Sequence, residues 1–273
     1  MPSERTPAKR VQSRDNAWYK SLQRLATSSR ERRAQRRAIL DGPHLIEAWR
    51  SGGATAEALV ASESGYARPE SRALFDETPA KTRVILADRL FDAVAQVSTP
   101  VGIMAVVPTP GPTLLPDRIG DAVLVDGVQD AGNLGSILRS AAAAAVPDVF
   151  LSPGTVFAWS PRVLRAGMGA HFVLSIHEAI RLEDLLERCL GRVVASDAHG
   201  PGSLHECDLR GPVAWIFGNE GAGVSAALAD RATDRLRIPM PGPTESLNVA
   251  AAAAVCLFEQ VRQRSVSRRD VPA

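Results

Sequence analysis

The chain has 273 residues, of which 45% are hydrophobic and 23% charged, and its formal net charge is +2. This composition is that of an ordinary soluble globular protein, and the longest apolar stretch, Val249 to Phe258, is too short to span a bilayer. The three cysteines stand far apart without a CxxC pattern, which argues against a disulfide framework or a zinc site and favours a cytoplasmic protein. The five histidines have no metal-ligand spacing, so we assign none of them a metal.

The positive charge is concentrated at the N-terminus. Residues 1–37 carry eleven Lys or Arg and three Asp or Glu, which leaves a mildly acidic remainder. A basic arm of this kind attracts phosphates without regard to sequence, although a solvated, partly disordered leader has the same composition. The segment lacks the apolar stretch of a secretory signal. We expect residues 1–15 to be a disordered basic arm and regard a nucleic-acid partner as supported by the charge.

The first predicted elements form a small α/β unit. From Ala17 onward, Trp18, Leu22 and Leu25 recur at helical spacing. The pattern then predicts, in order, a helix over 42–49, strands over 58–61 and 82–86, a helix over 88–96 and a strand over 102–107. The segment Pro108–Pro116 contains four prolines and is typical of a stiff linker. We therefore place one domain over residues 16–107 and a linker over 108–118.

Beyond the linker, residues 119–273 show regular strand–helix alternation. Short apolar runs predict strands over 122–126, 148–151, 172–175, 192–195, 213–217 and 235–238. Helices are predicted between several of them and at the end of the chain, over 134–145, 160–167, 182–190, 223–229 and 247–262. Buried parallel strands covered by helices on both faces have this pattern, so we predict a doubly covered parallel sheet.

The turn after the first strand of this domain carries candidate functional residues. Parallel α/β domains bind nucleotide-type ligands at the carboxyl ends of their strands. Residues 126–135 have neither the GxGxxG spacing nor a P-loop lysine, which argues against an NAD or ATP site. The turn instead places Asn133 at a helix start that carries Arg139, a combination suited to a phosphate. An equally simple interpretation makes Asn133 a helix cap and Arg139 a surface charge.

Two later loops are also candidates. The glycine-rich segment 217–223 (FGNEGAG) follows the strand 213–217 and places Glu220 at the mouth of a site. The segment 238–248 (IPMPGPTESLN) is stiffened by three prolines and runs into an alanine-rich helix. Considered without the other segments, this loop predicts only that Ser246 or Asn248 caps the N-terminus of that helix.

Taken together, these segments resemble a known family. The blocks NLGSILR, FGNEGAGVS and IPMPGPTESLNVAAAAAV, in this order across residues 122–262, resemble the three signature blocks of the SpoU family, also called the TrmH family, of RNA ribose methyltransferases. More loosely, residues 40–48 (LDGPHLIEA) and 98–103 (STPVGI) resemble the substrate-binding domain often fused ahead of it. Two departures are Ala131, where proline is common in the family, and Asp41, where glutamate is usual.

The resemblance implies a fold and a site. It implies a C-terminal SPOUT-type α/β domain with a deep trefoil knot, preceded by a small α/β RNA-binding domain, and it implies a homodimer. S-adenosylmethionine would be the cofactor, bound in the knot by Gly218, Ile238, Met240 and Leu247. The catalytic positions would be Arg139, supported by Asn133, together with Glu220, Ser246 and Asn248.

The resemblance further implies methylation of a ribose 2′-hydroxyl in structured RNA, with 23S ribosomal RNA favoured by the N-terminal domain. Transfer RNA is the alternative substrate, and a non-catalytic RNA-binding member of the fold is a second alternative. A dinucleotide-dependent oxidoreductase is disfavoured because its binding turn is missing. Arg139 would act as the base or, given the high pKa of arginine, as a clamp on the substrate phosphate.

Overall fold

The computed structural model describes residues 7–111 and 114–269. Two compact units divide the chain: one comprises Met1–Gly111 with Trp159–Phe172, and the other comprises Pro112–Ala158 with Val173–Ala273. The predicted division assigned residues 159–172 to the C-terminal domain. In the structure, the helix α8 (Pro161–Gly167) of this segment packs against β2 of the N-terminal unit, and Phe172 meets Trp49 edge to face with ring centroids 5.4 Å apart.

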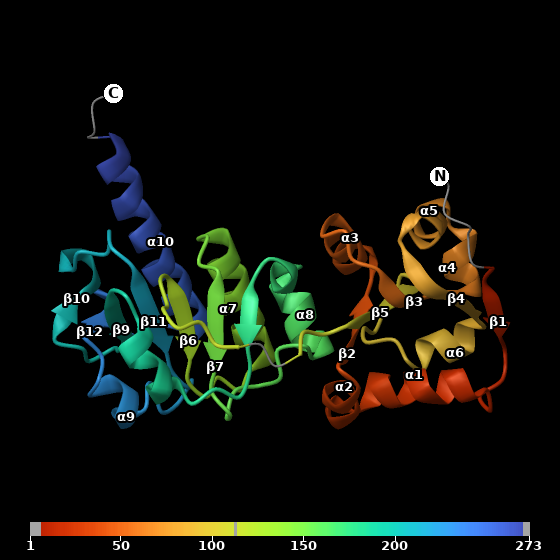
Figure 1. Ribbon diagram of the computed structural model, residues 1–273, viewed down its shortest axis with the longest axis horizontal. Helices are drawn as coiled ribbons and strands as arrows, with labels where there is room; N and C mark the ends of the chain where they lie inside the picture. The colour runs from red at the N-terminus through yellow and green to blue at the C-terminus, as the bar shows by residue number, and fades with distance from the viewer. Residues whose placement is uncertain (1–6, 112–113, 270–273) are drawn as a thin grey trace. The chain divides into compact units, whose positions relative to one another are not determined.

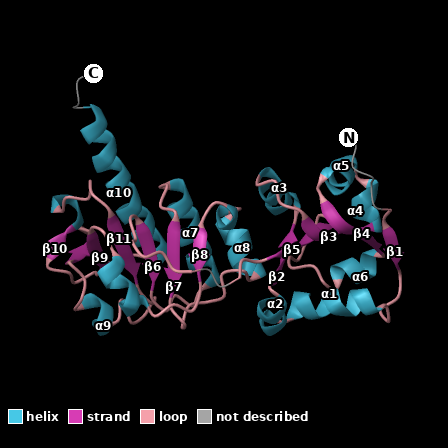
Figure 2. Ribbon diagram, viewed as in Figure 1, coloured by secondary structure: helices cyan, strands magenta, loops and turns pink. Residues whose placement is uncertain are grey.

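The N-terminal unit is built on a five-stranded mixed sheet of order β1-β4-β3-β5-β2 (Figures 1 and 2). Its strands are β1 (Lys9–Val11), β2 (Arg37–Asp41), β3 (Ala56–Ser62), β4 (Ala80–Leu86) and β5 (Ile103–Pro108). Its helices are α1 (Ala17–Thr27), α2 (Ser29–Gln35), α3 (Pro43–Ser51), α4 (Glu63–Ala67), α5 (Pro69–Glu77) and α6 (Asp88–Asp92). The helices α1 and α6 cover one face of the sheet, while α3, α4 and α5 lie on the other (Figure 1).

The helix α1 begins and packs as its sequence dictates. The side chain of Asn16 accepts hydrogen bonds from the backbone N–H groups of Trp18 and Tyr19, which caps the first turn. Tyr19, Leu22 and Leu25 then form one buried face, and the Tyr19 hydroxyl donates to the carbonyl of Leu90 at 3.2 Å. The predicted start of the helix at Ala17 is therefore confirmed.

The prediction of a disordered arm over residues 1–15 is wrong for part of its length. Residues 1–6 lie outside the described residues, but Lys9–Val11 form β1, which pairs in parallel with β4. Val11 is buried in the core beneath α1, and its carbonyl accepts a hydrogen bond from the backbone N–H of Ala87. A three-residue strand with two basic residues gives no period-2 signal, which is why the pattern did not reveal it.

The C-terminal unit contains a seven-stranded sheet in which every pairing is parallel, with the order β10-β12-β9-β11-β6-β7-β8. Its strands are β6 (Ala122–Val125), β7 (Asp148–Leu151), β8 (Ser175–His177), β9 (Arg192–Ser196), β10 (Gly202–Ser203), β11 (Val213–Phe217) and β12 (Asp234–Arg237). Its helices are α7 (Ala131–Ala143), α9 (Ala226–Ala229) and α10 (Val249–Arg269), with short 3-10 helices η2 (Leu182–Arg188) and η3 (Leu204–Glu206). The predicted parallel sheet is confirmed.

The two faces of this sheet are covered by different elements. Alternate residues of the central strand β11, Ala214 and Ile216, pack in the core beneath η2 and α9. Trp215, between them, is fully buried on the opposite side, where its indole N–H donates to Gln260 of α10 at 2.8 Å. The helix α10 lies beside α7 on that side (Figure 1).

Two local predictions are corrected. The strand predicted over 172–175 is displaced, because Ala170–Phe172 form the 3-10 helix η1 and Val173 is exposed, so that β8 begins at Ser175. The helix predicted over 182–190 is the 3-10 helix η2, in which Leu182, Leu185 and Leu186 are buried. The spacing of these leucines serves a 3-10 turn as well as an α-turn.

Candidate active site

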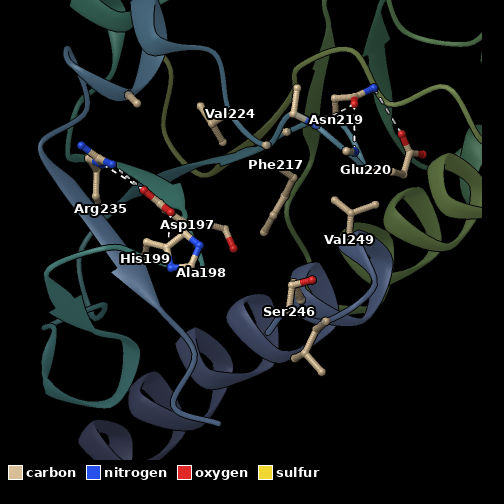
Figure 3. Close-up of a pocket in the computed structure, with 18 of the residues that line it drawn as sticks. Asp197, Ala198, His199, Phe217, Asn219, Glu220, Val224, Arg235, Ser246 and Val249 are labelled. Carbon is tan, nitrogen blue, oxygen red and sulfur yellow. Dashed lines mark hydrogen bonds and ion pairs between the residues drawn. The ribbon is translucent and has the colours of Figure 1, made fainter. Parts of the chain in front are cut away.

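A cavity of about 680 Å³ opens at the carboxyl ends of β9, β11 and β12, against the start of α10 (Figure 3). All four predicted cofactor residues line it, namely Gly218, Ile238, Met240 and Leu247. Glu220 and Ser246 line it as well. The neighbouring parallel strands end at one edge of the sheet, and this brings together loops that lie far apart in the sequence.

Gly218 is the tightest point of the cavity wall. A Cβ added at this residue would lie 2.1 Å from the carbonyl carbon of Gly223 and 2.2 Å from the amide nitrogen of Val224. The backbones of Asn219 and Gly223 exchange two hydrogen bonds of 2.9 Å, and Gly223 has a φ of +71°. The loop after β11 therefore folds back on itself so closely that position 218 has no room for a side chain.

Asn219, which sequence analysis did not single out, holds this loop in place. Its amide Nδ2 donates to the carbonyl of Gly127 at 2.8 Å, and its Oδ1 accepts from the backbone N–H groups of Gly221 and Ala222. An asparagine among glycines is an ordinary turn residue, so its sequence signal was weak. In the structure it fastens the loop after β11 to the loop after β6.

Glu220 is the centre of a hydrogen-bond network. Its carboxylate accepts from the backbone N–H groups of Gln129 (3.3 Å) and Asp130 (3.0 Å) and from the side-chain amide of Asn133 (3.0 Å). Burial raises the pKa of Glu220, but the hydrogen bonds from Asn133 and the backbone outweigh it and hold the pKa below its usual value. Glu220 is thus an ionised acceptor at neutral pH.

The network continues to α10. The Oδ1 of Asn133 accepts from the Nδ2 of Asn248 at 2.9 Å, and the Oδ1 of Asn248 accepts from the backbone N–H groups of Ala250 and Ala251. Asn248 therefore caps α10 while it is tied to α7 through Asn133. The sequence-predicted residues Asn133, Glu220 and Asn248 are brought together, and most of their hydrogen-bonding capacity is spent on one another and on the backbone.

Arg139 stands apart from this network. It lies six residues after Asn133 on α7, roughly 9 Å along the helix axis, and it is exposed. Its guanidinium contacts no acceptor among the described residues, and it does not line the cavity. The expectation that Asn133 supports Arg139 is not met, because the amide of Asn133 is engaged by Glu220 and Asn248.

A second polar group lies on the other side of the cavity (Figure 3). Arg235 donates to Oδ2 of Asp197 from Nε (3.0 Å) and Nη2 (2.7 Å), and the backbone N–H of His199 donates to Oδ1 (2.9 Å). Burial raises the pKa of Asp197, but the hydrogen bonds with Arg235 and His199 outweigh it and lower that pKa. This pair was not predicted, because Asp197 directly follows β9 and Arg235 is the second residue of β12, and neither position belongs to a motif.

The lining indicates the kind of ligand that would fit. Phe217, Val224 and Ile238 supply apolar wall, while the carboxylates of Asp197, Glu220, Asp230 and Glu245 outnumber the single arginine. A cavity of this size and mixed lining is suited to a nucleoside-type ligand that carries positive charge. Among the residues that the structure describes, no group of His, Cys, Asp and Glu side chains could hold a metal ion, and no helix is long and apolar enough to cross a membrane.

Comparisons with known proteins match this architecture. The pattern of the SpoU rRNA Methylase family matches residues 121–258. The 23S rRNA (guanosine(2553)-2′-O)-methyltransferase RlmP of Bacillus subtilis is 33% identical over 253 residues, which cover 92% of this chain and 98% of the relative. The 23S rRNA (guanosine-2′-O-)-methyltransferase RlmB of Bordetella pertussis is 34% identical over 191 residues, 66% of this chain and 77% of the relative.

A solved structure shows the same fold. The SpoU methyltransferase AviRb from Streptomyces viridochromogenes, in complex with the cofactor AdoMet, has a TM-score of 0.83 and 26% sequence identity. The similarity covers 92% of this chain and 98% of AviRb.

Proposed function

The chain belongs to the SpoU rRNA methylase family, and from this premise we propose that it is an S-adenosylmethionine-dependent methyltransferase acting on a ribose 2′-hydroxyl of ribosomal RNA. The observation that carries the proposal is the cavity at the ends of β9, β11 and β12, whose walls contain the four expected cofactor residues together with Glu220 and Ser246. Two of the relatives are named as methyltransferases of guanosine in 23S rRNA, which favours 23S rRNA as the substrate.

The residues of the cavity fit S-adenosylmethionine. Gly218 contributes only backbone to the cavity wall, and Ile238 and Leu247 supply apolar surface beside it. The excess of carboxylates suits a ligand with a sulfonium charge, because opposite charges at short range stabilise each other. Gly218, Ile238, Met240 and Leu247 would hold the cofactor, which when bound supplies an electrophilic methyl group.

The protein has to orient the hydroxyl and assist loss of its proton, since a ribose 2′-hydroxyl is a poor nucleophile at neutral pH. Asn133, Glu220 and Asn248 act as positioning residues, because their hydrogen bonds fix the loops after β6 and β11 and the start of α10. Ser246 and Arg139 keep side chains that are not engaged in this network. We assign Arg139 to the substrate phosphate and the reacting hydroxyl, as a clamp rather than as the base, because of its high pKa.

Three further properties expected of the family belong to this proposal. We infer that the segment from β11 to α10 forms the trefoil knot, since its loops build the cavity. We also infer a homodimer, because Val255 and Phe258, one turn apart on α10, are 38% and 47% exposed. A ribosomal RNA substrate would place the enzyme in the cytoplasm.

The proposal is tested by methyl transfer from labelled S-adenosylmethionine to unmodified 23S rRNA and, separately, to transfer RNA. The products are digested to nucleosides and identified by mass spectrometry. We expect a 2′-O-methylnucleoside from 23S rRNA. Product from transfer RNA alone would show that transfer RNA is the substrate. Binding of cofactor without product from either RNA would favour the non-catalytic alternative.

A further inference from the structure

The N-terminal unit contains a groove of about 310 Å³ that belongs to none of the sites described above. It lies between α1 and the sheet, at the end of the sheet where β2, β3 and β4 begin and β5 ends. Its walls are formed by four residues of α1 and by residues of these strands, namely Trp18, Ser21, Leu22, Leu25, Arg37, Glu57, Ala58, Lys81, Thr82 and Val106.

The groove exists because one row of the sheet carries small side chains beneath α1. Ala58 pairs in register with Thr82 on one side and with Val106 on the other, and this row forms the floor. The next row, Val60 with Val84 and Met104, is larger; Ala58 and Val106 of the first row belong to the same buried core. The groove lies beside α1 at this row of smaller side chains.

The rim of the groove is aromatic and basic. Trp18 is half-buried, packs partly against the core and lines the groove, and Lys81 at the start of β4 is exposed with no ion-pair partner among the described residues. Arg37 is held by Glu57 at 2.5 Å, so the three charged residues of the rim leave one net positive charge. Outside the rim, Lys20 and Arg24 are exposed on α1, and Lys20 is paired with Asp15 at 3.1 Å.

We propose that this groove binds an unpaired nucleotide of the RNA substrate, with its base against Trp18 and its backbone phosphate at Lys81. Aromatic stacking and a cationic rim are the two elements by which proteins bind single strands, whereas a duplex keeps its bases inside the helix. The volume lies at the small end of ligand pockets, which span about 300–1,000 Å³, and so suits one base rather than a helix. The inference rests on the proposed RNA substrate but not on catalysis.

The test measures binding of a fluorescein-labelled 12-nucleotide single-stranded RNA of mixed sequence, and of the same RNA as a duplex, to the full-length protein by fluorescence anisotropy. Lys81→Glu is expected to weaken single-strand binding about tenfold and to lower the salt dependence by about one phosphate contact. Trp18→Leu keeps apolar packing beneath the helix and is expected to weaken single-strand binding about fivefold or more through lost stacking. Duplex binding should change less in both variants.

Arg72→Glu is the matched control, since Arg72 is an exposed cation on α5, on the opposite face of the sheet. It should change single-strand binding by less than about twofold. Wild-type affinity in both groove variants, or an equal loss for single strand and duplex, would overturn the proposal. If Trp18→Leu lowers the melting temperature, the substitute test is crosslinking of a 4-thiouridine RNA to the wild-type protein. A crosslink in the peptide Asp15–Lys20 is expected, and the absence of that crosslink would count against the groove.

The experiment separates this inference from the proposed function. Failure of the wild-type protein to methylate any RNA would refute the methyltransferase proposal while the anisotropy comparison stands. Methylation of 23S rRNA together with unchanged RNA binding by the groove variants would refute the groove alone.

Discussion

Arg139 is exposed, and we expect its side chain to matter for methyl transfer and not for folding. Arg139 contributes no hydrogen bond or ion pair within the described residues, so Arg139→Ala should change the free energy of unfolding by no more than about 0.5 kcal/mol. As an electrostatic clamp its loss should lower methyl transfer about 100-fold or more, and Arg139→Lys should not restore it, because lysine lacks the planar fork. Turnover is measured with labelled cofactor and cofactor affinity by calorimetry. An Ala variant with normal turnover would disprove the assignment.

Glu220 should behave differently, because its role is to position other groups. In Glu220→Gln, an amide replaces a carboxylate that accepts from two backbone N–H groups and from Asn133, so one donor would face another. Because Glu220 is exposed, we expect the free energy of unfolding to fall by only about 0.5–1.5 kcal/mol, together with loss of turnover. Urea denaturation provides the measurement. Glu245→Gln is the control for stability, since Glu245 lines the same cavity without a hydrogen bond among the described residues.

At the scale of elements, the loop after β11 depends on the absence of one side chain. Gly218→Ala would press a methyl group into the backbone of Gly223 and Val224, which cannot move without opening the loop. We expect loss of detectable S-adenosylmethionine binding and a lower melting temperature. Gly120→Ala should leave both unchanged, because a Cβ at Gly120 meets nothing within 4 Å. Normal cofactor affinity in Gly218→Ala would show that the loop does not form the binding surface.

The helix α10 carries a pH-sensitive group at Glu259. Hydrogen bonds from Arg262, with a further one from Gln263, overcome burial and lower the pKa of Glu259 to about 2. Because the pKa is depressed on folding, the stabilisation is fully present above the unfolded value of about 4.3 and is lost as the pH falls towards 2.

Glu259→Gln should therefore show a flatter dependence of unfolding free energy on pH between pH 5 and 3 than the wild type. The difference at neutral pH should be about 2 kcal/mol, reduced by the exposure of Arg262. Urea denaturation at several pH values measures it. Glu206→Gln, at an exposed carboxylate, should retain the wild-type slope; an identical slope in Glu259→Gln would contradict the assignment.

Different elements were predictable to different degrees. The strands β7 and β11 have the predicted bounds because they are buried apolar runs between turn residues. β1 and β10 were missed because strands of two or three residues carry no periodic signal, and their pairing depends on distant partners. In the site, the second and third blocks identified the lining residues Gly218, Glu220 and Ser246. The role of Asn219 and the Asp197–Arg235 pair could not be predicted, because each depends on which loops the fold brings together.

At the scale of the whole molecule, the chain divides its charge. Residues 1–37 are strongly basic while the remainder is acidic, and the basic segment supplies β1, α1 and α2 of the N-terminal unit. The acidic remainder contains the cavity, whose carboxylates suit a cationic cofactor. RNA attraction and cofactor binding are thus assigned to surfaces of opposite charge, so neither needs to compromise the other.

The assembly state is the last property that the surface predicts. Leu257 and Cys256 of α10 are buried within the chain, whereas Val255 and Phe258 leave an apolar stripe facing solvent, and such stripes mark contact surfaces. Phe258→Glu would place a charge in the proposed dimer contact and should convert a dimer to a monomer in light scattering coupled to gel filtration. Leu190→Glu, at an exposed leucine after η2, should leave the mass unchanged. Because Arg139 does not line the cavity of its own chain, loss of methyl transfer by the Phe258→Glu monomer would indicate that a second copy completes the site; a fully active monomer would exclude it.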